Sequence, residues 1–141
     1  MPLVATWCER EHLRGKEREY CHTFFGLADG SALAFFQFND PDDYAELSAS
    51  TTMSLNHLAL AVDNAGQDEL VERLAEHGVP HRVVDHGYCR SLYISDPDGL
   101  SVEFTCDAAN VEAINTQRKS DAHTELARWL AGDRTPNNNL R

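Results

Sequence analysis

The chain has 141 residues, 42% of them hydrophobic, which suits one compact domain or two small repeats that share a core. Its formal net charge of −11 would repel a nucleic-acid backbone, so we expect no nucleic-acid partner. No apolar run approaches the length of a membrane span and residues 1–4 show no signal pattern, so we expect a soluble cytoplasmic protein with no membrane partner.

The N-terminal third of the chain predicts strands separated by polar segments. Three short apolar runs are expected to be strands: residues 3–8, 21–25 and 32–38. The last two are joined by a turn at residues 28–31, which contains the Asp-Gly pair typical of hairpins. The charged segment 9–19 is expected to be a solvated loop or a hairpin. Residues 39–52, rich in Asp, Ser and Thr, are expected to form a linker.

A more regular pattern begins at residue 54. A strand over residues 55–62 leads into helical spacing over residues 67–77, and Gly78 can adopt the left-handed conformation that ends a helix. Three strands should follow, over residues 79–85, 90–95 and 100–106. The turn before the last strand, residues 96–99, has the sequence Asp-Pro-Asp-Gly.

The end of the chain predicts one more helix. Ser120 or Asp121 can cap a helix that continues to about residue 131. Residues 134–141 are expected to be a frayed tail. The chain therefore divides into residues 1–53, a first partial unit with its linker, residues 54–106, and a C-terminal helix and tail over residues 107–141.

Two strands of the central segment each carry one titratable residue on a polar face. Because side chains alternate along a strand, His57 shares its face with Leu55, Ala59 and Ala61, whereas the bulkier Leu58, Leu60 and Val62 point the other way. Glu103 likewise shares its face with Ser101 and Thr105. A sheet that is apolar on one side and carries a histidine and a carboxylate on the other is typical of a metal-binding or substrate cavity.

The cysteines predict neither a zinc site nor disulfides. Cys8, Cys21, Cys89 and Cys106 are widely spaced and form no C-x-x-C pair. Reduced thiols are therefore expected, as in most cytoplasmic proteins.

Residues 54–106 resemble a βαβββ module of the vicinal oxygen chelate superfamily, which includes glyoxalase I, the bleomycin and fosfomycin resistance proteins and the extradiol dioxygenases. The resemblance is carried by segments 55–62 and 86–104, with the Asp-Pro-Asp-Gly turn before the last strand. It implies an α+β fold in which two βαβββ modules form one cupped mixed sheet. Residues 20–38 resemble the end of a preceding module whose first strand and helix are missing. Either the chain is truncated relative to such proteins or a partner chain completes the cup, and we expect a homodimer.

The resemblance also implies a metal centre. The positions of His57 and Glu103 match the metal ligands on the first and fourth strands of such modules, and Gln37 is placed at the corresponding fourth-strand position of the first module. The implied cofactor is a divalent metal, with Fe(II) favoured and Mn, Ni or Zn as alternatives. Tyr93 and His86 are the candidate acid/base groups, and His22 is a further candidate.

Three functions fit this resemblance. The first is an extradiol dioxygenase-like enzyme that acts on a small catecholic substrate with vicinal oxygens. The second is a glyoxalase-like lyase or isomerase, in which a carboxylate beyond the metal ligands would move a proton. The third is a non-catalytic protein that binds a small molecule, such as a drug. The two enzymes require a metal, and the binding protein does not.

Overall fold

The computed structural model describes residues 1–48, 56–97 and 99–140, which form two compact units. Unit 1 contains residues 1–48 and 112–139, and unit 2 contains residues 49–111 and 140–141. Seven strands in two sheets and three helices lie in the described part of the chain, which confirms the predicted α+β class with a C-terminal helix. None of the helices in this part is both long and apolar enough to cross a membrane.

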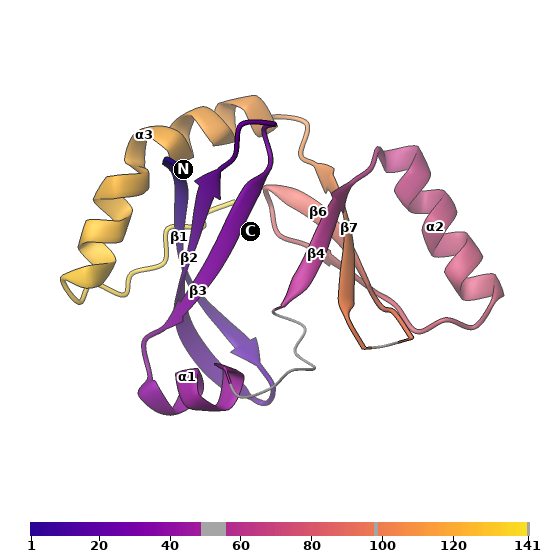
Figure 1. The fold of residues 1–141 in the computed structure, drawn as a ribbon, viewed down its shortest axis with the longest axis horizontal. Helices are drawn as coiled ribbons and strands as arrows, with labels where there is room; N and C mark the ends of the chain where they lie inside the picture. The colour runs from indigo at the N-terminus through magenta and orange to yellow at the C-terminus, as the bar shows by residue number, and fades with distance from the viewer. Residues whose placement is uncertain (49–55, 98, 141) are drawn as a thin grey trace. The chain divides into compact units, whose positions relative to one another are not determined.

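Unit 1 is built on a three-stranded antiparallel meander, β1–β2–β3 (Figure 1). Its strands are β1 (Leu3–Leu13), β2 (Lys16–Gly26) and β3 (Ala32–Phe38). The charged segment 9–19 is thus a hairpin rather than a loop. Arg14 and Gly15, both with positive φ (52° and 80°), form the two-residue turn that matches the twist of paired strands.

The segment expected to be a linker contains helix α1 (Pro41–Ser48), and residues 49–52 lie outside the described residues. Pro41 occupies the first helical position, where its missing N–H costs nothing, and the Asp40 carboxylate accepts from the Asp42 N–H at 2.8 Å. Asp43 then pairs with Arg18 of β2 at 3.1 Å, and both side chains are almost fully buried. A buried ion pair that composition could not predict therefore holds this short helix.

Helix α3 (Val111–Leu130) begins about nine residues before the position predicted from the sequence. Polar residues such as Gln117 and Lys119 interrupt the apolar pattern in the first turns, so the sequence does not predict a helix there. Ile114, Ala122 and Trp129 are nevertheless all buried along the helix. Its last turn packs Trp129 against Cys8 and Cys21, which form the core of unit 1.

The tail after α3 is tied down rather than frayed. The Asn137 N–H donates to the Cys8 carbonyl at 3.0 Å, and the Asn137 side chain accepts from the Cys8 N–H at 2.8 Å. These bonds place the tail along the outer edge of β1, where it supplies the backbone partners that a fourth strand would otherwise provide.

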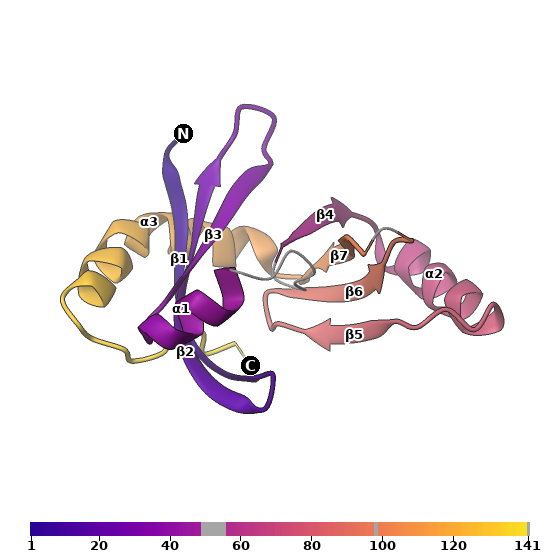
Figure 2. The ribbon, with the colours of Figure 1, turned by 60° about the horizontal axis from the view of Figure 1, so that its bottom comes forward.

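Unit 2 is a four-stranded mixed sheet in the order β4–β7–β6–β5, seen clearly in Figure 2. The strands are β4 (His57–Ala61), β5 (Arg82–Asp85), β6 (Cys89–Ser95) and β7 (Ser101–Asp107). β4 and β7 are parallel, and the other neighbours are antiparallel. The predicted strand at residues 79–85 starts only at Arg82, since Pro80 cannot donate to the ladder.

Helix α2 (Asn64–Glu76) covers one face of this sheet. The Asp63 carboxylate caps it by accepting from the Gly66 N–H at 2.7 Å, and Gly78, with φ 64°, follows its end as predicted. Gln67 of this helix is fully buried against the sheet, where its amide donates to the carbonyls of Arg90 and Phe104 at 3.0 and 2.7 Å. Helix α2 therefore covers only part of the apolar side of the sheet, where Leu58 and Leu60 stay exposed, and the opposite side carries the polar residues.

Candidate metal and substrate site

The parallel pairing of β4 with β7 brings His57 and Glu103 together. His57 pairs with Ser101 and Ala59 with Glu103, so both titratable side chains lie on the face opposite α2. The Nε2 atom of His57 lies 2.8 Å from Oε2 of Glu103, and the side chains are 20% and 8% exposed. We call the face that bears these residues the polar face of unit 2.

Ser91 of β6 holds the other oxygen of the same carboxylate. Its hydroxyl is fully buried and donates to Glu103 Oε1 at 2.5 Å. Burial of Glu103 acts to raise its pKa, but the hydrogen bonds from His57 and Ser91 outweigh burial and lower the pKa of Glu103 below its ordinary value. The carboxylate is therefore held ionised, with one oxygen directed at His57.

Tyr93 and His86 form a second pair on the polar face. Tyr93 lies directly opposite Glu103 across β6 and β7, and its hydroxyl is 3.0 Å from Nε2 of His86. The Tyr93 ring meets the rings of His57 and His86 edge to face, with centroids 5.9 and 6.2 Å apart. Four of the predicted site residues thus lie in one cluster.

Burial sets the protonation of this second pair. It lowers the pKa of His86, so that imidazole is neutral near pH 7. It also raises the pKa of Tyr93, with the nearby Glu103 charge acting in the same direction, so the phenol keeps its proton. The neutral imidazole of His86 can accept a proton from the Tyr93 phenol, and the resulting imidazolium can return it.

Sequence reasoning missed Arg82, which stands beside this pair. Arg82 of β5 pairs with Tyr93, and its guanidinium carbon lies 4.9 Å from the centroid of the Tyr93 ring. It forms no salt bridge with any residue that the structure describes. The sequence places Arg82 in a short strand after Pro80, but it does not show that this strand pairs with the strand of Tyr93. Without that pairing, nothing indicates that Arg82 lies at the site.

The two remaining candidates lie in unit 1. Gln37 of β3 accepts a hydrogen bond from the Trp129 indole at 2.9 Å through its amide oxygen. His22 of β2 is buried between Phe24 and Phe36, whose ring centroids lie 4.2 and 3.9 Å away. Each of these two residues therefore has an evident packing role within unit 1, and their roles at a metal site stay predictions.

The donor chemistry of His57 and Glu103 suits a divalent ion. Two ligands at right angles around an ion, each at about 2.1 Å, hold their donor atoms roughly 3 Å apart. The observed separation of 2.8 Å is close to that value. Within residues 1–48, 56–97 and 99–140, no group of three or more His, Cys, Asp or Glu side chains is placed to hold a metal. The spacing of the pair therefore fits two protein ligands of one ion.

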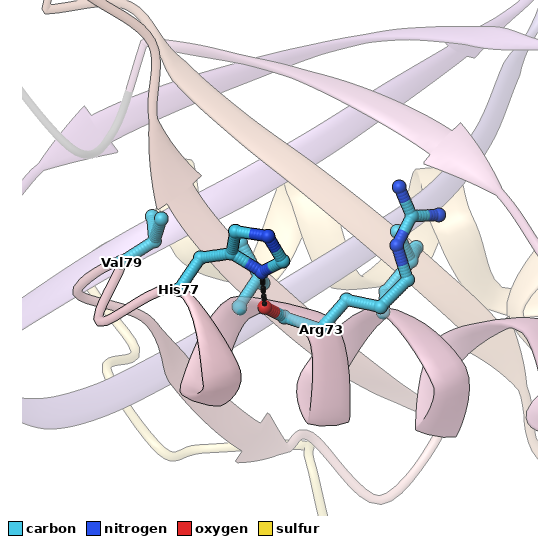
Figure 3. Close-up of a pocket in the computed structure, with 5 residues that line it drawn as sticks. Arg73, His77 and Val79 are labelled. Atoms are coloured by element: carbon cyan, nitrogen blue, oxygen red, sulfur yellow. Dashed lines mark hydrogen bonds between the residues drawn. The ribbon is translucent and has the colours of Figure 1, made fainter.

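A separate cavity of about 290 Å³ lies at the C-terminal end of α2 (Figure 3). Leu70, Leu74 and Val79 provide its apolar lining, and Arg73 and His77 stand beside them. The ring of His77 is fixed by a 2.8 Å contact between its Nδ1 atom and the Arg73 carbonyl. None of the polar-face residues lines this cavity, so it is not part of the candidate site.

Comparison with known families places most of the chain in one superfamily. The model of the Glyoxalase/Bleomycin resistance protein/Dioxygenase superfamily matches residues 9–104, a range that includes His57, His86, Tyr93 and Glu103. No curated protein matches the chain significantly.

Proposed function

The chain belongs to the Glyoxalase/Bleomycin resistance protein/Dioxygenase superfamily, and on that premise we propose that it is a metal-dependent enzyme of the extradiol dioxygenase type. Its substrate would be a small catecholic compound with two neighbouring oxygens. The observation that carries the proposal is the contact of 2.8 Å between His57 Nε2 and Glu103 Oε2 on a polar, largely buried face.

His57 and Glu103 are the residues that would hold the metal, with Fe(II) favoured. A bound divalent ion would act as a Lewis acid that lowers the pKa of substrate hydroxyls and leaves positions open for oxygen. Ser91 keeps the carboxylate in place through its buried hydrogen bond, and this fixes which oxygen of Glu103 faces the site.

Tyr93 and His86 would handle the substrate proton. A substrate hydroxyl near the Tyr93 oxygen could lose its proton to that oxygen as the Tyr93 proton moves to Nε2 of His86, which lies 3.0 Å away. The reverse transfer would return a proton to the product. Burial keeps His86 neutral near pH 7, so its ring can accept this proton, and its lowered pKa makes it release the proton readily in the reverse transfer.

The glyoxalase-like alternative has less support on this face. That reaction needs a carboxylate to move a proton, yet both oxygens of Glu103 are engaged, one by Ser91 and one by His57. The lyase would therefore need a further carboxylate, whereas the dioxygenase can use the Tyr93–His86 pair.

A metal-free binding protein is the second candidate function. It is favoured because, in the part of the chain that the structure describes, no third His, Cys, Asp or Glu side chain is placed to join His57 and Glu103, whereas catalytic metal sites usually have three protein ligands. The same polar face would then bind a small molecule through Tyr93, His86 and Arg82 without chemistry.

Metal content and oxygen uptake separate these functions. We expect protein purified without chelator to carry a divalent metal, and the Fe(II)-loaded protein to consume oxygen and turn a catechol into a yellow ring-cleavage product. His57→Ala should abolish both, whereas His77→Ala, at the end of α2, should abolish neither. Ligand binding that needs no metal and survives His57→Ala would favour the binding protein, and isomerisation without oxygen uptake would favour the lyase.

We further propose that the protein is a homodimer. Leu58 and Leu60 of β4 are 52% and 43% exposed, and β4 is an edge strand of its sheet. Leu33 and Phe35 of the edge strand β3 are exposed to a similar degree. Apolar residues on open strand edges favour association with another chain. Sedimentation at micromolar concentration should give twice the mass of the chain, and a clean monomer would contradict this.

A further inference from the structure

We propose that Cys8 and Cys21 form a peroxide-responsive thiol pair, which closes into a disulfide between strands β1 and β2. This modification site goes beyond the proposed function, because both cysteines belong to unit 1 and neither lies on the polar face of unit 2. Both thiols are free in the structure.

The strand register places the two cysteines directly opposite each other. Cys8 pairs with Cys21, so their side chains leave the same face of the sheet. The N–H and the carbonyl of Cys8 are both bonded to Asn137 on the outer edge of β1, at 2.8 and 3.0 Å. Since both groups point away from β2, Cys8 and Cys21 form a non-hydrogen-bonded pair of the antiparallel ladder.

This type of pair has the spacing that a disulfide needs. Opposite residues at non-hydrogen-bonded positions have Cα atoms about 4.5 Å apart, with the side chains close together. Disulfides span Cα separations of roughly 4.4–6.8 Å. Closure of the bond therefore requires rotation of the side chains, and the backbone can stay in place.

The surroundings make the two thiols unequal. A hydrogen bond with Cys21 lowers the pKa of Cys8 and outweighs the effect of burial, while the positive charge of Arg128 acts to lower the pKa of both thiols. The same hydrogen bond and burial raise the pKa of Cys21. Cys8 is thus the nucleophile of the pair, since the thiolate is the reactive form.

The reaction balances with one peroxide. The Cys8 sulfur attacks one oxygen of hydrogen peroxide, the O–O bond breaks, and the product is a sulfenic acid and one water. The Cys21 sulfur then attacks the Cys8 sulfur, the S–O bond breaks, and a second water leaves. The two sulfur atoms together lose two electrons, and the peroxide gains them.

The C-terminal tail helps to hold in place the helix that covers this pair. Cys8 and Cys21 are 0% and 1% exposed, because Trp129 covers them from α3. The Asn137 amide also donates to the Thr6 carbonyl at 3.0 Å and to Glu125 at 2.8 Å, which fixes the tail over the edge of β1. Chain ends open more readily than cores, so release of the tail is the expected route for peroxide.

The other two cysteines serve as internal controls. Cys89 lies opposite Asp107 and Cys106 lies opposite Arg90, so neither faces a second thiol. Burial raises the pKa of both Cys89 and Cys106. Neither has the geometry or the ionisation that the Cys8–Cys21 pair has.

Peptide mapping of the whole chain tests the proposal. The reduced protein is treated with one equivalent of hydrogen peroxide, alkylated under denaturing conditions and digested. We expect a Cys8–Cys21 linkage, with Cys89 and Cys106 alkylated, and a change in tryptophan fluorescence as the bond forms. Oxidation of Cys89 while Cys8 and Cys21 stay reduced would overturn the proposal.

Two pairs of variants test the assigned roles. In Cys21→Ser, whose hydroxyl can still donate to the Cys8 sulfur, a 1,3-diketone reagent for sulfenic acids should label Cys8, and in Cys8→Ser it should leave Cys21 unlabelled. Asn137→Ala should speed disulfide formation roughly tenfold, because loss of one or two hydrogen bonds changes an opening equilibrium by about that factor. Asn139→Ala, at an exposed position two residues further along the tail, should leave the rate close to that of the wild type. Equal labelling of both cysteines, or equal rates in the two Asn variants, would contradict the mechanism.

Discussion

His57 and Glu103 touch across the parallel strands β4 and β7, with Nε2 of one 2.8 Å from Oε2 of the other. A contact this short between a histidine and a buried carboxylate has two interpretations. Either the imidazole donates a hydrogen bond to the carboxylate, or both groups are ligands of one metal ion. The family to which the chain belongs favours the second interpretation.

Removal of the His57 imidazole should weaken metal binding. We expect His57→Ala to lower the affinity for Mn(II), an oxygen-stable substitute for Fe(II), by more than the roughly 10–100-fold that loss of an outer-shell partner costs. Titration calorimetry measures this directly. His77→Ala is the matched control. His77 lies at the end of α2, where its ring contacts the Arg73 carbonyl and is not part of the polar face. Equal affinities of both variants and the wild type would refute the metal assignment.

Ser91 should matter for both stability and metal affinity. Its hydroxyl is buried and donates to an ionised carboxylate, and hydrogen bonds to charged groups contribute about 1.5–3 kcal/mol. We expect Ser91→Ala to lower the free energy of unfolding in urea by about that amount and to reduce Mn(II) affinity about 10–100-fold. Ser95→Ala, at the exposed end of the same strand, should change neither quantity, and Ser91→Thr should restore part of both.

The polar face could be predicted from alternation alone, but its connections could not. The period of two along the chain places His57, Glu103 and Tyr93 on one side of their strands, and the structure brings them together there. The partner of each group depends on strand order and register. No local sequence pattern predicts that Ser91 donates to Glu103 or that Arg82 lies over the Tyr93 ring.

Errors at the element level have the same origin. Helix α1 depends on the burial of Asp43 against Arg18, two residues that are distant in sequence, and the tail is ordered because Asn137 binds the backbone of Cys8. Both segments look polar and linker-like when read locally. Their structure comes from long-range contacts, which composition and periodicity do not encode.

Arg82 should favour ligands that carry an acidic group. Its guanidinium stands beside Tyr93 without a salt-bridge partner in the described residues, and arginine binds carboxylates through two parallel hydrogen bonds. We expect a catechol with a carboxylate substituent to bind more tightly than catechol itself, and Arg82→Gln to remove most of this preference. Arg90→Gln is the control, since Arg90 already pairs with Asp68 at 2.8 Å. Loss of preference in both variants would point to net charge rather than to Arg82.

His86 should make the protein less stable in mild acid. Burial lowers its pKa in the folded state below the ordinary 6.5, so the unfolded chain binds the proton more readily. The stabilisation from a neutral His86 is therefore fully present above about pH 6.5 and decreases as the pH falls from there towards the lowered folded pKa. Urea unfolding across this range should show the decrease in the wild type and a flatter profile in His86→Asn. His77→Asn should retain the wild-type profile, and a wild-type profile in His86→Asn would assign the effect to another group.

Gln37 offers a direct test between a structural role and a ligand role. Its amide oxygen accepts from the indole of Trp129, a residue that is only 2% exposed. A buried donor left without an acceptor costs about 1–3 kcal/mol, so we expect Gln37→Leu to destabilise the protein by that amount and Gln37→Glu to have little effect. Trp129→Phe removes the donor and should cancel the additional cost of Gln37→Leu in a double-mutant cycle. If Gln37→Leu also lowers Mn(II) affinity where Trp129→Phe does not, the amide oxygen is a metal ligand as predicted from the sequence. If metal affinity is the same in both, Gln37 serves only to hold α3 against the sheet.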